Sequence, residues 1–330
     1  MVLMLLIAFF VSLAVAAAAG YFLIPALRRV KAGQSIRGDG PVWHRNKEGT
    51  PTMGGVMFIS GIVIACLTVG LREMLEGTFN HIFILIFALC FAAIGFVDDY
   101  KKLKKKENQG LTAAQKFTLQ VVAAAGFVAL MRFTGNLTPI LYIPFFNVTM
   151  RIPEPLYYIF AAFVVVGTVN SVNITDGVDG LATGVSIPVA AFFMVVACMW
   201  KYTSIGVFAA ALAGGLVGFL IFNFHPAKIF MGDTGALFIG GAICAIAFTL
   251  DMPLILIPLG IVYFIETISD IIQVAYFKLT HGKRIFKMAP LHHHFEMCGW
   301  SEYKIFAVFS AVSVVFAVIS YFGVNMRDIG

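Results

Sequence analysis

Ten apolar runs constrain the fold of this chain more than any other feature. A helix of about 20 apolar residues spans a bilayer, so the ten runs would place about 200 of the 330 residues in the membrane. Only 12% of the residues are charged, whereas a soluble domain has about a quarter. We therefore predict one polytopic all-α membrane domain over residues 1–330, with about ten transmembrane helices and no separate soluble domain. The runs lie at about residues 3–27, 53–71, 79–97, 117–131, 156–172, 181–199, 203–224, 236–250, 252–277 and 305–324.

The distribution of Lys and Arg predicts how these helices are oriented. The loops that follow the odd-numbered runs hold 18 of the 23 basic residues, and the other side holds five. By the positive-inside rule the 18 face the cytoplasm, so both termini are expected outside. No basic residue precedes the first run, whereas Arg28 and Arg29 follow it, which favours an uncleaved helix over a secretory signal. The net charge of +6 then belongs mainly to the inner loops, and we expect no nucleic acid partner.

The outer segment from Arg132 to Glu154 is the only long external loop. Its sequence PILYIPFFNVTMRIPEP predicts a short extended hairpin interrupted by Pro144 and Pro153. It contains no recognisable chemistry. The polar clusters that need an explanation lie almost entirely in the five inner loops.

Two adjacent carboxylates begin the second inner loop. Asp98 and Asp99 directly follow an apolar run of 19 residues, and negative charge at a helix C-terminus opposes the helix dipole. A bound divalent cation would explain them. Neighbouring helical residues point about 100° apart, so one carboxylate can bind a metal while the other orients a lysine or takes a proton. Lys102 and Lys116 are the basic residues that we expect to face a substrate phosphate.

A third carboxylate, Asp233, directly precedes the eighth apolar run in the fourth inner loop. It has two interpretations. Asp is a good helix N-cap, but a lone acid between Gly232 and Gly235 is also a good ligand for Mg²⁺, which typically takes one or two protein carboxylates together with substrate phosphates and water.

The first inner loop ends at the N-terminus of the second predicted helix. There Thr50, Thr52, Gly54 and Gly55 could offer hydroxyls and backbone amides to an anion, with Lys47 close by in sequence. The alternative is an ordinary Thr-Pro helix start with glycines that serve packing.

The third inner loop contains no basic residue. Asn170, Asn173, Asp176 and Asp179 recur every three residues, and such amides and carboxylates can hydrogen-bond the edges of a sugar or a base. The alternative is a loop of turn-forming residues. Because no nearby Lys or Arg compensates the two carboxylates, we favour a functional role.

Polar residues also form a stripe on the ninth run, at Glu266, Ser269, Asp270 and Gln273. Ionisable residues within a membrane are costly and face a bundle interior or a hydrated cleft. Pro253 and Pro258, earlier in this run, are placed to bend it. The fifth inner loop then carries His292, His293 and His294. Because Mg²⁺ prefers oxygen ligands, phosphate contact or proton transfer is the better role for these imidazoles.

Five inner-loop motifs together resemble a known family, the polyprenyl-phosphate N-acetylhexosamine-1-phosphate transferases. They are PTMGG at 51–55, DDYKK at 98–102, NITDGVDGL at 173–181, NFHPAKIFMGDTG at 223–235 and LHHHFE at 291–296. They occur in the family's order, and the resemblance covers essentially the whole chain. The triple His followed by Phe-Glu resembles the muramoyl-pentapeptide branch more than the N-acetylglucosamine branch.

The resemblance implies a ten-helix, Mg²⁺-dependent enzyme of the bacterial cytoplasmic membrane, usually a homodimer, with its active site facing the cytoplasm. Such enzymes transfer phospho-N-acetylmuramoyl-pentapeptide from UDP-N-acetylmuramoyl-pentapeptide to undecaprenyl phosphate in peptidoglycan synthesis, which yields lipid I and UMP. Residues matching the family's catalytic positions are Asp98, Asp99, Asp233 and His292, of which the three aspartates are the metal-site candidates. Residues assigned to substrate binding are Lys47, Thr52, Lys102, Lys116, Asn173, Asp176, Asp179, Asn223, Phe230, Gly232, Gln273, His293 and His294.

Two other functions are compatible with parts of the sequence. The first is a sibling enzyme that uses UDP-N-acetylglucosamine. The second is a cation-coupled transporter with Asp98, Asp233 and Glu266 as an ion path, although a transporter predicts polar residues through the depth of the bilayer, whereas here they concentrate at the inner loops. For the transferase, direct attack by the lipid phosphate and a two-step route through an aspartyl phosphate are both chemically possible.

Overall fold

The chain forms a bundle of helices with one small sheet in a computed structural model. The structure describes residues 1–29, 47–105, 109–135, 138–325 and 327, so residues 30–46 of the first inner loop lie outside it. The helices are α1 (Val2–Arg29), α2 (Gly55–Thr68), α3 (Leu71–Leu75), α4 (Asn80–Lys105), α5 (Ala113–Phe133), α6 (Glu154–Thr175), α7 (Leu181–Met199), α8 (Thr203–Asn223), α9 (Gly232–Thr249), α10 (Leu256–Leu259), α11 (Ile261–Leu279), α12 (Leu291–Met297) and α13 (Glu302–Val324). A 3₁₀ helix, η2 (Pro253–Ile255), precedes α10, and the two strands are β1 (Ile140–Ile143) and β2 (Val148–Arg151).

The predicted apolar runs coincide with helices. In the described part of the chain, eight helices are long and apolar enough to cross a membrane: α1, α4, α5, α6, α7, α8, α9 and α13. The bent pair of Pro253–Leu259 and α11 brings the number to nine if it is one span, whereas α2 is apolar but has only 14 residues. A multi-pass, mostly helical membrane protein is therefore confirmed, and the number of about ten spans stays a prediction.

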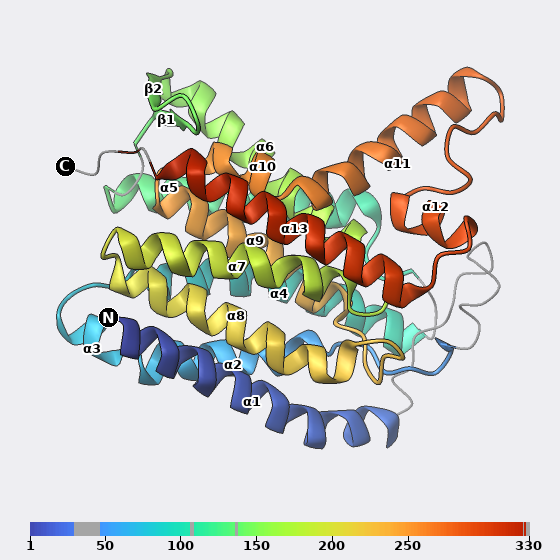
Figure 1. Ribbon diagram of the computed structural model, residues 1–330, viewed down its shortest axis with the longest axis horizontal. Helices are drawn as coiled ribbons and strands as arrows, with labels where there is room; N and C mark the ends of the chain where they lie inside the picture. The colour runs from blue at the N-terminus through green and yellow to red at the C-terminus, as the bar shows by residue number, and fades with distance from the viewer. Residues whose placement is uncertain (30–46, 106–108, 136–137, 326, 328–330) are drawn as a thin grey trace.

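The ninth predicted run is broken at Gly260, two residues after Pro258. Pro253 lies in η2 and Pro258 in α10, and neither has a backbone N–H to donate to a preceding turn. The axis turns by 79° between Pro253–Leu259 and α11, which confirms the predicted bend. As a result, α11 leans away from the other helices and leads to α12 at the same end of the molecule (Figure 1).

Glycines allow the central helices to approach closely. In α8 and α9, 83% of the most apolar stretch is buried, against 17% in α13. A Cβ on Gly214 of α8 would overlap the carbonyl of Phe9 in α1, and a Cβ on Gly95 of α4 would overlap the carbonyl of Asp233 in α9. Packing of small residues drives helix association in lipid, where the hydrophobic effect between helices is absent. The contact at Gly95 fixes the start of α9 against α4.

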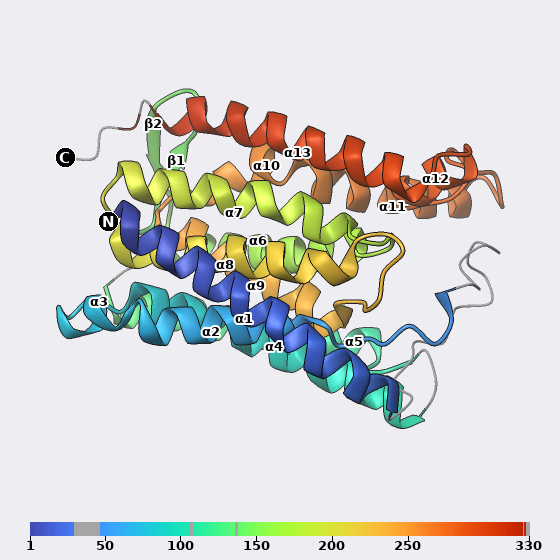
Figure 2. The same ribbon diagram turned by 60° about the horizontal axis from the view of Figure 1, so that its bottom comes forward.

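The outer segment folds as the predicted hairpin. β1 and β2 are antiparallel, with Ile140 opposite Arg151, and Pro144 lies in the turn between them. The N–H of Phe145 in this turn donates to the carbonyl of Gly323 near the end of α13, at 3.0 Å. The hairpin therefore lies at the end of the bundle that also holds the start of α1 and the end of α13, opposite α12 (Figure 1 and Figure 2).

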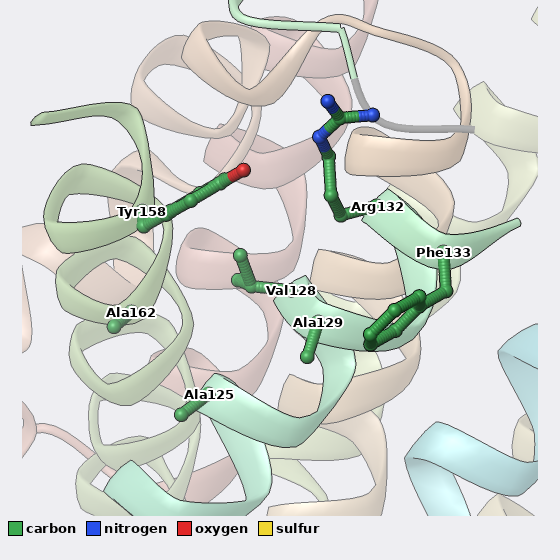
Figure 3. A pocket seen from close by; sticks show the side chains of 7 residues that line it. All are labelled: Ala125, Val128, Ala129, Arg132, Phe133, Tyr158 and Ala162. Carbon is green, nitrogen blue, oxygen red and sulfur yellow. The ribbon is translucent and has the colours of Figure 1, made fainter. Parts of the chain in front are cut away.

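A groove opens between α5 and α6 near the hairpin end of the bundle. It has a volume of about 360 Å³, and the side chains of Arg132 and Tyr158 lie at one end of it (Figure 3). Arg132 pairs with Glu154 at 3.5 Å, and the Tyr158 hydroxyl donates to the same carboxylate. The other lining residues are Ala125, Val128, Ala129, Phe133 and Ala162. This groove is separate from the inner-loop residues, which gather at the opposite end of α5.

Candidate active site

Three carboxylates from two helices meet where α4 packs against the start of α9. Oxygen atoms of Asp98, Asp99 and Asp233 all lie within 4.8 Å of one another. Asp98 and Asp99 are buried, whereas the side chain of Asp233 is 15% exposed. The three residues that the sequence identified as catalytic and metal-binding candidates are therefore brought together in the structure.

Asp99 caps the N-terminus of α9 from another helix. Its Oδ2 accepts hydrogen bonds from the Thr234 N–H at 2.9 Å and the Thr234 hydroxyl at 2.6 Å, and its Oδ1 accepts from the Asp233 N–H at 3.1 Å. The interpretation of Asp233 as a simple N-cap is therefore wrong, because Asp233 lies inside the first turn of α9 and Asp99 satisfies the free N–H groups.

The position of Asp98 and Asp99 relative to the helix dipole also needs correction. They were expected at the C-terminus of their helix, but α4 continues to Lys105. Their carboxylates therefore do not lie at its negative end. Instead, the Asp99 carboxylate lies at the N-terminus of α9, where the helix dipole stabilises negative charge.

A glycine with a left-handed backbone makes room for this cap. Gly232 has φ +69°, and a Cβ there would lie 2.5 Å from Asp99 Oδ2 and 2.9 Å from the Thr52 hydroxyl oxygen. An L side chain is strained in this conformation and has no space. Gly232 thus keeps Thr52, Asp99 and the start of α9 in contact.

Two lysines neutralise part of the carboxylate charge. Lys102 Nζ lies 2.6 Å from Asp98 and 3.0 Å from Asp233, and Lys116 Nζ lies 2.8 Å from Asp233. Asn173 bridges the group, since its Nδ2 donates to Asp233 at 2.9 Å and its Oδ1 accepts from Lys116 at 3.2 Å. The two lysines expected to face a phosphate therefore contact carboxylates in this structure.

Asp176 adds a fourth carboxylate beside this cluster. It is the C-cap of α6, and its side chain has no hydrogen-bond partner among the described residues. Burial raises the pKa of the Asp176 carboxyl well above its usual value, and the negative charges of Asp233 and Asp99 raise it further. Without Asp176, the three carboxylates of Asp98, Asp99 and Asp233 lie with two ammonium groups, Lys102 and Lys116, which leaves an excess of one negative charge when all five groups are ionised. A bound cation would offset this excess.

A second ion cluster holds four segments of the chain together. Lys47 Nζ lies 2.7 Å from Asp179 and 2.6 Å from Glu302, and Asp179 also accepts from the Ala227 N–H at 2.9 Å. His225 Nδ1 lies 2.9 Å from the same carboxylate. The expectation that both acids of the third inner loop lack a compensating charge is therefore wrong for Asp179. Burial alone would raise the pKa of the Asp179 carboxyl, but Lys47 and the N–H donors outweigh it and hold the pKa below its usual value.

The amides of Gly54 and Gly55 are not available to an anion. They donate to the carbonyls of Phe230 and Met231, at 2.8 and 2.9 Å, and a Cβ on Gly55 would overlap the backbone of Gly235. Packing is the correct interpretation of these two glycines. The pairing brings segment 51–55 against segment 229–233, and so places Thr52 next to Gly232.

Two further predicted residues support loops through their own side chains. Asn223 accepts from the Thr183 hydroxyl at 2.9 Å and donates to the carbonyl of Ile229 at 3.0 Å. Gln273 donates to the carbonyl of Phe286 at 3.0 Å, and its side-chain oxygen accepts from two N–H groups of the same loop. Phe230 is half-buried, and its backbone N–H and carbonyl pair with Pro51 and Gly54.

The three histidines differ in their surroundings. His292 is buried and its Nδ1 lies 2.9 Å from Oε2 of Glu266. His293 and His294 are half-buried; His293 pairs with Glu296 at 2.6 Å, and His294 Nδ1 accepts from the Lys287 N–H at 3.1 Å. From sequence alone, Glu266 has no predicted role in the transferase site. Its place on the polar stripe at i, i+3 and i+7 was the signal that could have identified it.

The chain matches two family models. Residues 81–251 match the model described as Glycosyl transferase family 4, and residues 47–59 match phospho-N-acetylmuramoyl-pentapeptide-transferase signature 1. The first match contains the carboxylates of α4 and α9, and the second contains Lys47 and Thr52.

Curated relatives named phospho-N-acetylmuramoyl-pentapeptide-transferase are similar over nearly the whole chain. The relative from Clostridium acetobutylicum is 47% identical over 92% of this chain and 93% of its own length. One from Clostridium perfringens is 45% identical over 96% and 98%, and one from Staphylococcus aureus is 47% identical over 90% and 92%.

Proposed function

The chain belongs to the phospho-N-acetylmuramoyl-pentapeptide-transferase family, and on this premise we propose that the carboxylate cluster of α4 and α9 is its active site. The protein is a transferase of peptidoglycan synthesis. It moves phospho-N-acetylmuramoyl-pentapeptide from a UDP carrier to a polyprenyl phosphate, forming lipid I and UMP. We take the acceptor to be undecaprenyl phosphate.

The observation that carries this proposal is the meeting of three carboxylates with two lysines. Asp98, Asp99 and Asp233 lie within 4.8 Å of one another, and Lys102 and Lys116 contact two of them. Phosphoryl transfer depends mainly on positioning and on neutralising charge, and needs little covalent help from the protein. A cluster of movable ammonium groups and fixed carboxylates suits both tasks.

The donor set fits Mg²⁺, which prefers oxygen ligands and keeps several of them from substrate and water. Asp233 is the most accessible of the three carboxylates. The Oδ2 atom of Asp98 is buried, and its one contact among the described residues is with Lys102. Both oxygens of Asp99 accept from N–H and hydroxyl groups of the first turn of α9, whereas the donors to the Asp233 oxygens are side chains that can move, namely those of Lys102, Lys116 and Asn173. Asp233 and Asp98 would therefore hold the ion, with Asp99 positioning Asp233. Bound there, Mg²⁺ would act as a Lewis acid on the diphosphate.

The remaining groups act on the phosphates and the proton. Lys102 and Lys116 can exchange a carboxylate contact for a phosphate oxygen. Asp98 positions or deprotonates the lipid phosphate, whose oxygen attacks the phosphorus attached to the sugar while the bond to the oxygen of UMP breaks. His292 contacts the sugar phosphate or carries a proton.

The residues beyond the reacting atoms are assigned to substrate binding. Thr52 and Phe230, on the paired segments at 51–55 and 229–233, would bind the nucleotide together with Lys47, with help from Asp176 and Asn173. The others named from the sequence keep this assignment: Asp179, Asn223, Gly232, Gln273, His293 and His294.

The site is placed at the cytoplasmic face of the bacterial inner membrane. Supporting this, 18 of the 23 basic residues lie on loops of the same side as the site, and the start of α1 and end of α13 lie together at the opposite end (Figure 1). With α2 and the bent pair counted, the chain has ten spans, forms a single domain over residues 1–330, and has both termini and the hairpin outside. We also propose a homodimer, following the family resemblance.

The test is UMP release by detergent-purified protein given UDP-N-acetylmuramoyl-pentapeptide, undecaprenyl phosphate and Mg²⁺. Asp233→Asn and chelation should each abolish release. Asp251→Asn is the matched control, because Asp251 is a partly buried acid beyond the other end of α9. Release with UDP-N-acetylglucosamine only would move the protein to the sibling branch, and no release with either donor would contradict the proposal.

A further inference from the structure

Glu266 is a fully buried carboxylate whose described contacts all go to one residue. It lies on α11 and is 0% exposed. Its Oε2 lies 2.9 Å from His292 Nδ1, and its two oxygens lie 3.2 and 3.3 Å from the His292 backbone nitrogen. A buried carboxylate is costly unless it is paired and hydrogen-bonded. The carboxylate of Glu266 therefore has His292 as its partner. The bend at Gly260 directs α11, which carries Glu266, toward α12, which carries His292.

This contact determines which nitrogen of His292 is free. A carboxylate only accepts hydrogen bonds, so Nδ1 carries a hydrogen and Nε2 is left to react or bind. His292 Nε2 is buried and has no hydrogen-bond partner among the described residues. An unpaired buried ring nitrogen costs free energy, which is consistent with a group kept for a ligand.

The free nitrogen faces the loop that carries the candidate substrate residues. A Cβ added to Gly177 would overlap His292 Nε2, so the imidazole fits here because residue 177 has no side chain. Gly177 directly follows Asp176, the unpartnered carboxylate beside the cluster. The Nε2 atom thus lies against Gly177, at the Asp176–Gly177 edge of the site.

We propose that Glu266 is a positioning residue for the transfer reaction. It holds the His292 ring with Nε2 directed at the Asp176–Gly177 edge of the site, and its negative charge stabilises the imidazolium whenever Nε2 carries a proton. Glu266 acts only through His292 and does not touch substrate. This inference rests on the proposed function, because it requires His292 to act on the substrate.

A double-mutant cycle tests it. Glu266→Gln should lower kcat at least about tenfold, on the scale of a lost acid–base contribution, while KM for the nucleotide substrate changes less than about threefold. His292→Ala should lower kcat at least as much. The double variant should match His292→Ala, because Glu266 has no role once the imidazole is gone. Glu266→Asp, which keeps the charge, should recover part of the kcat lost in Glu266→Gln.

The controls separate this role from a purely structural one. Ser269→Ala removes another buried polar group of α11, whose hydroxyl donates only to the carbonyl of Glu266 at 2.7 Å, and should keep wild-type kcat. Additive losses in the double variant would overturn the inference, as would unchanged kcat in Glu266→Gln. Full turnover in His292→Ala would overturn it too, but would leave the proposed function standing as long as Asp233→Asn remains inactive.

Discussion

Replacing Asp99 should destabilise the fold as well as abolish activity, because this carboxylate caps α9 from α4. Asp99→Ala removes the acceptor for two N–H groups and one hydroxyl. Loss of a helix cap costs about 0.5–2 kcal/mol, and a buried donor left without a partner costs about 1–3 kcal/mol. Thr234 is only 3% exposed, so water replaces little of the loss. We expect about 2–4 kcal/mol for Ala, and about half of that for Asn, which keeps one oxygen.

Thermal unfolding of the detergent-purified variants, followed by intrinsic fluorescence in the presence of a chelator, measures this effect without a metal contribution. The expected order of unfolding midpoints is wild type, then Asp99→Asn, then Asp99→Ala. Asp98→Asn serves as the comparison at the adjacent position, because its Oδ1 accepts from a single N–H, that of Leu111, and its Oδ2 contacts the partly exposed Lys102. It should shift the midpoint less, since an ion pair open to solvent contributes little to stability. If Asp99→Ala unfolds with the wild type while losing activity, Asp99 acts as a ligand and the capping argument fails.

Three other variants test separate parts of the site. Asp176→Asn should raise the unfolding midpoint at neutral pH, because the raised pKa of the wild-type carboxyl means that its charged form lowers the free energy of unfolding. As the pH falls through that pKa toward about 4, the midpoint of the wild type should approach that of the variant. Lys47→Ala should cost about 2 kcal/mol at neutral pH, and the difference from wild type should shrink in acid, below about pH 4, as Asp179 is protonated through its lowered pKa, while the contact of Lys47 with Glu302 accounts for the remainder. Gly232→Ala should cost about 1–2 kcal/mol from its left-handed backbone alone and reduce UMP release, which thermal unfolding and the release assay detect together.

The sequence was sufficient for the helices and for the set of residues at the cluster. Helix formation in a membrane follows from apolar composition and from the need to satisfy every backbone group within the helix, so each run could be predicted without its neighbours. The break before α11 could also be predicted, because the missing N–H groups of Pro253 and Pro258 act locally. With 14 residues, α2 is shorter than the run at 53–71 that predicted it.

The electrostatic partners could not be predicted in the same way. Asp179 has no basic residue near it in sequence, and its counter-charge comes from Lys47, 132 positions away. The amides of Gly54 and Gly55 looked available because the carbonyls that accept from them belong to residues 230 and 231. Both errors treated a polar group as free because its partner lies elsewhere in the chain, and buried polar groups in a folded protein nearly always have a partner.

The pair Asp98–Asp99 shows what local geometry does determine. Adjacent helical residues differ by about 100° in direction, so the two carboxylates need not share one role. Tertiary packing then selected the roles: Asp99 faces the free N–H groups of α9, and Asp98 faces Lys102 and the Leu111 N–H. Because the cap fixes the first turn of α9, it also fixes Asp233 against Asp98. The capping carboxylate of Asp99 therefore brings the carboxylates of Asp98 and Asp233 together in one site.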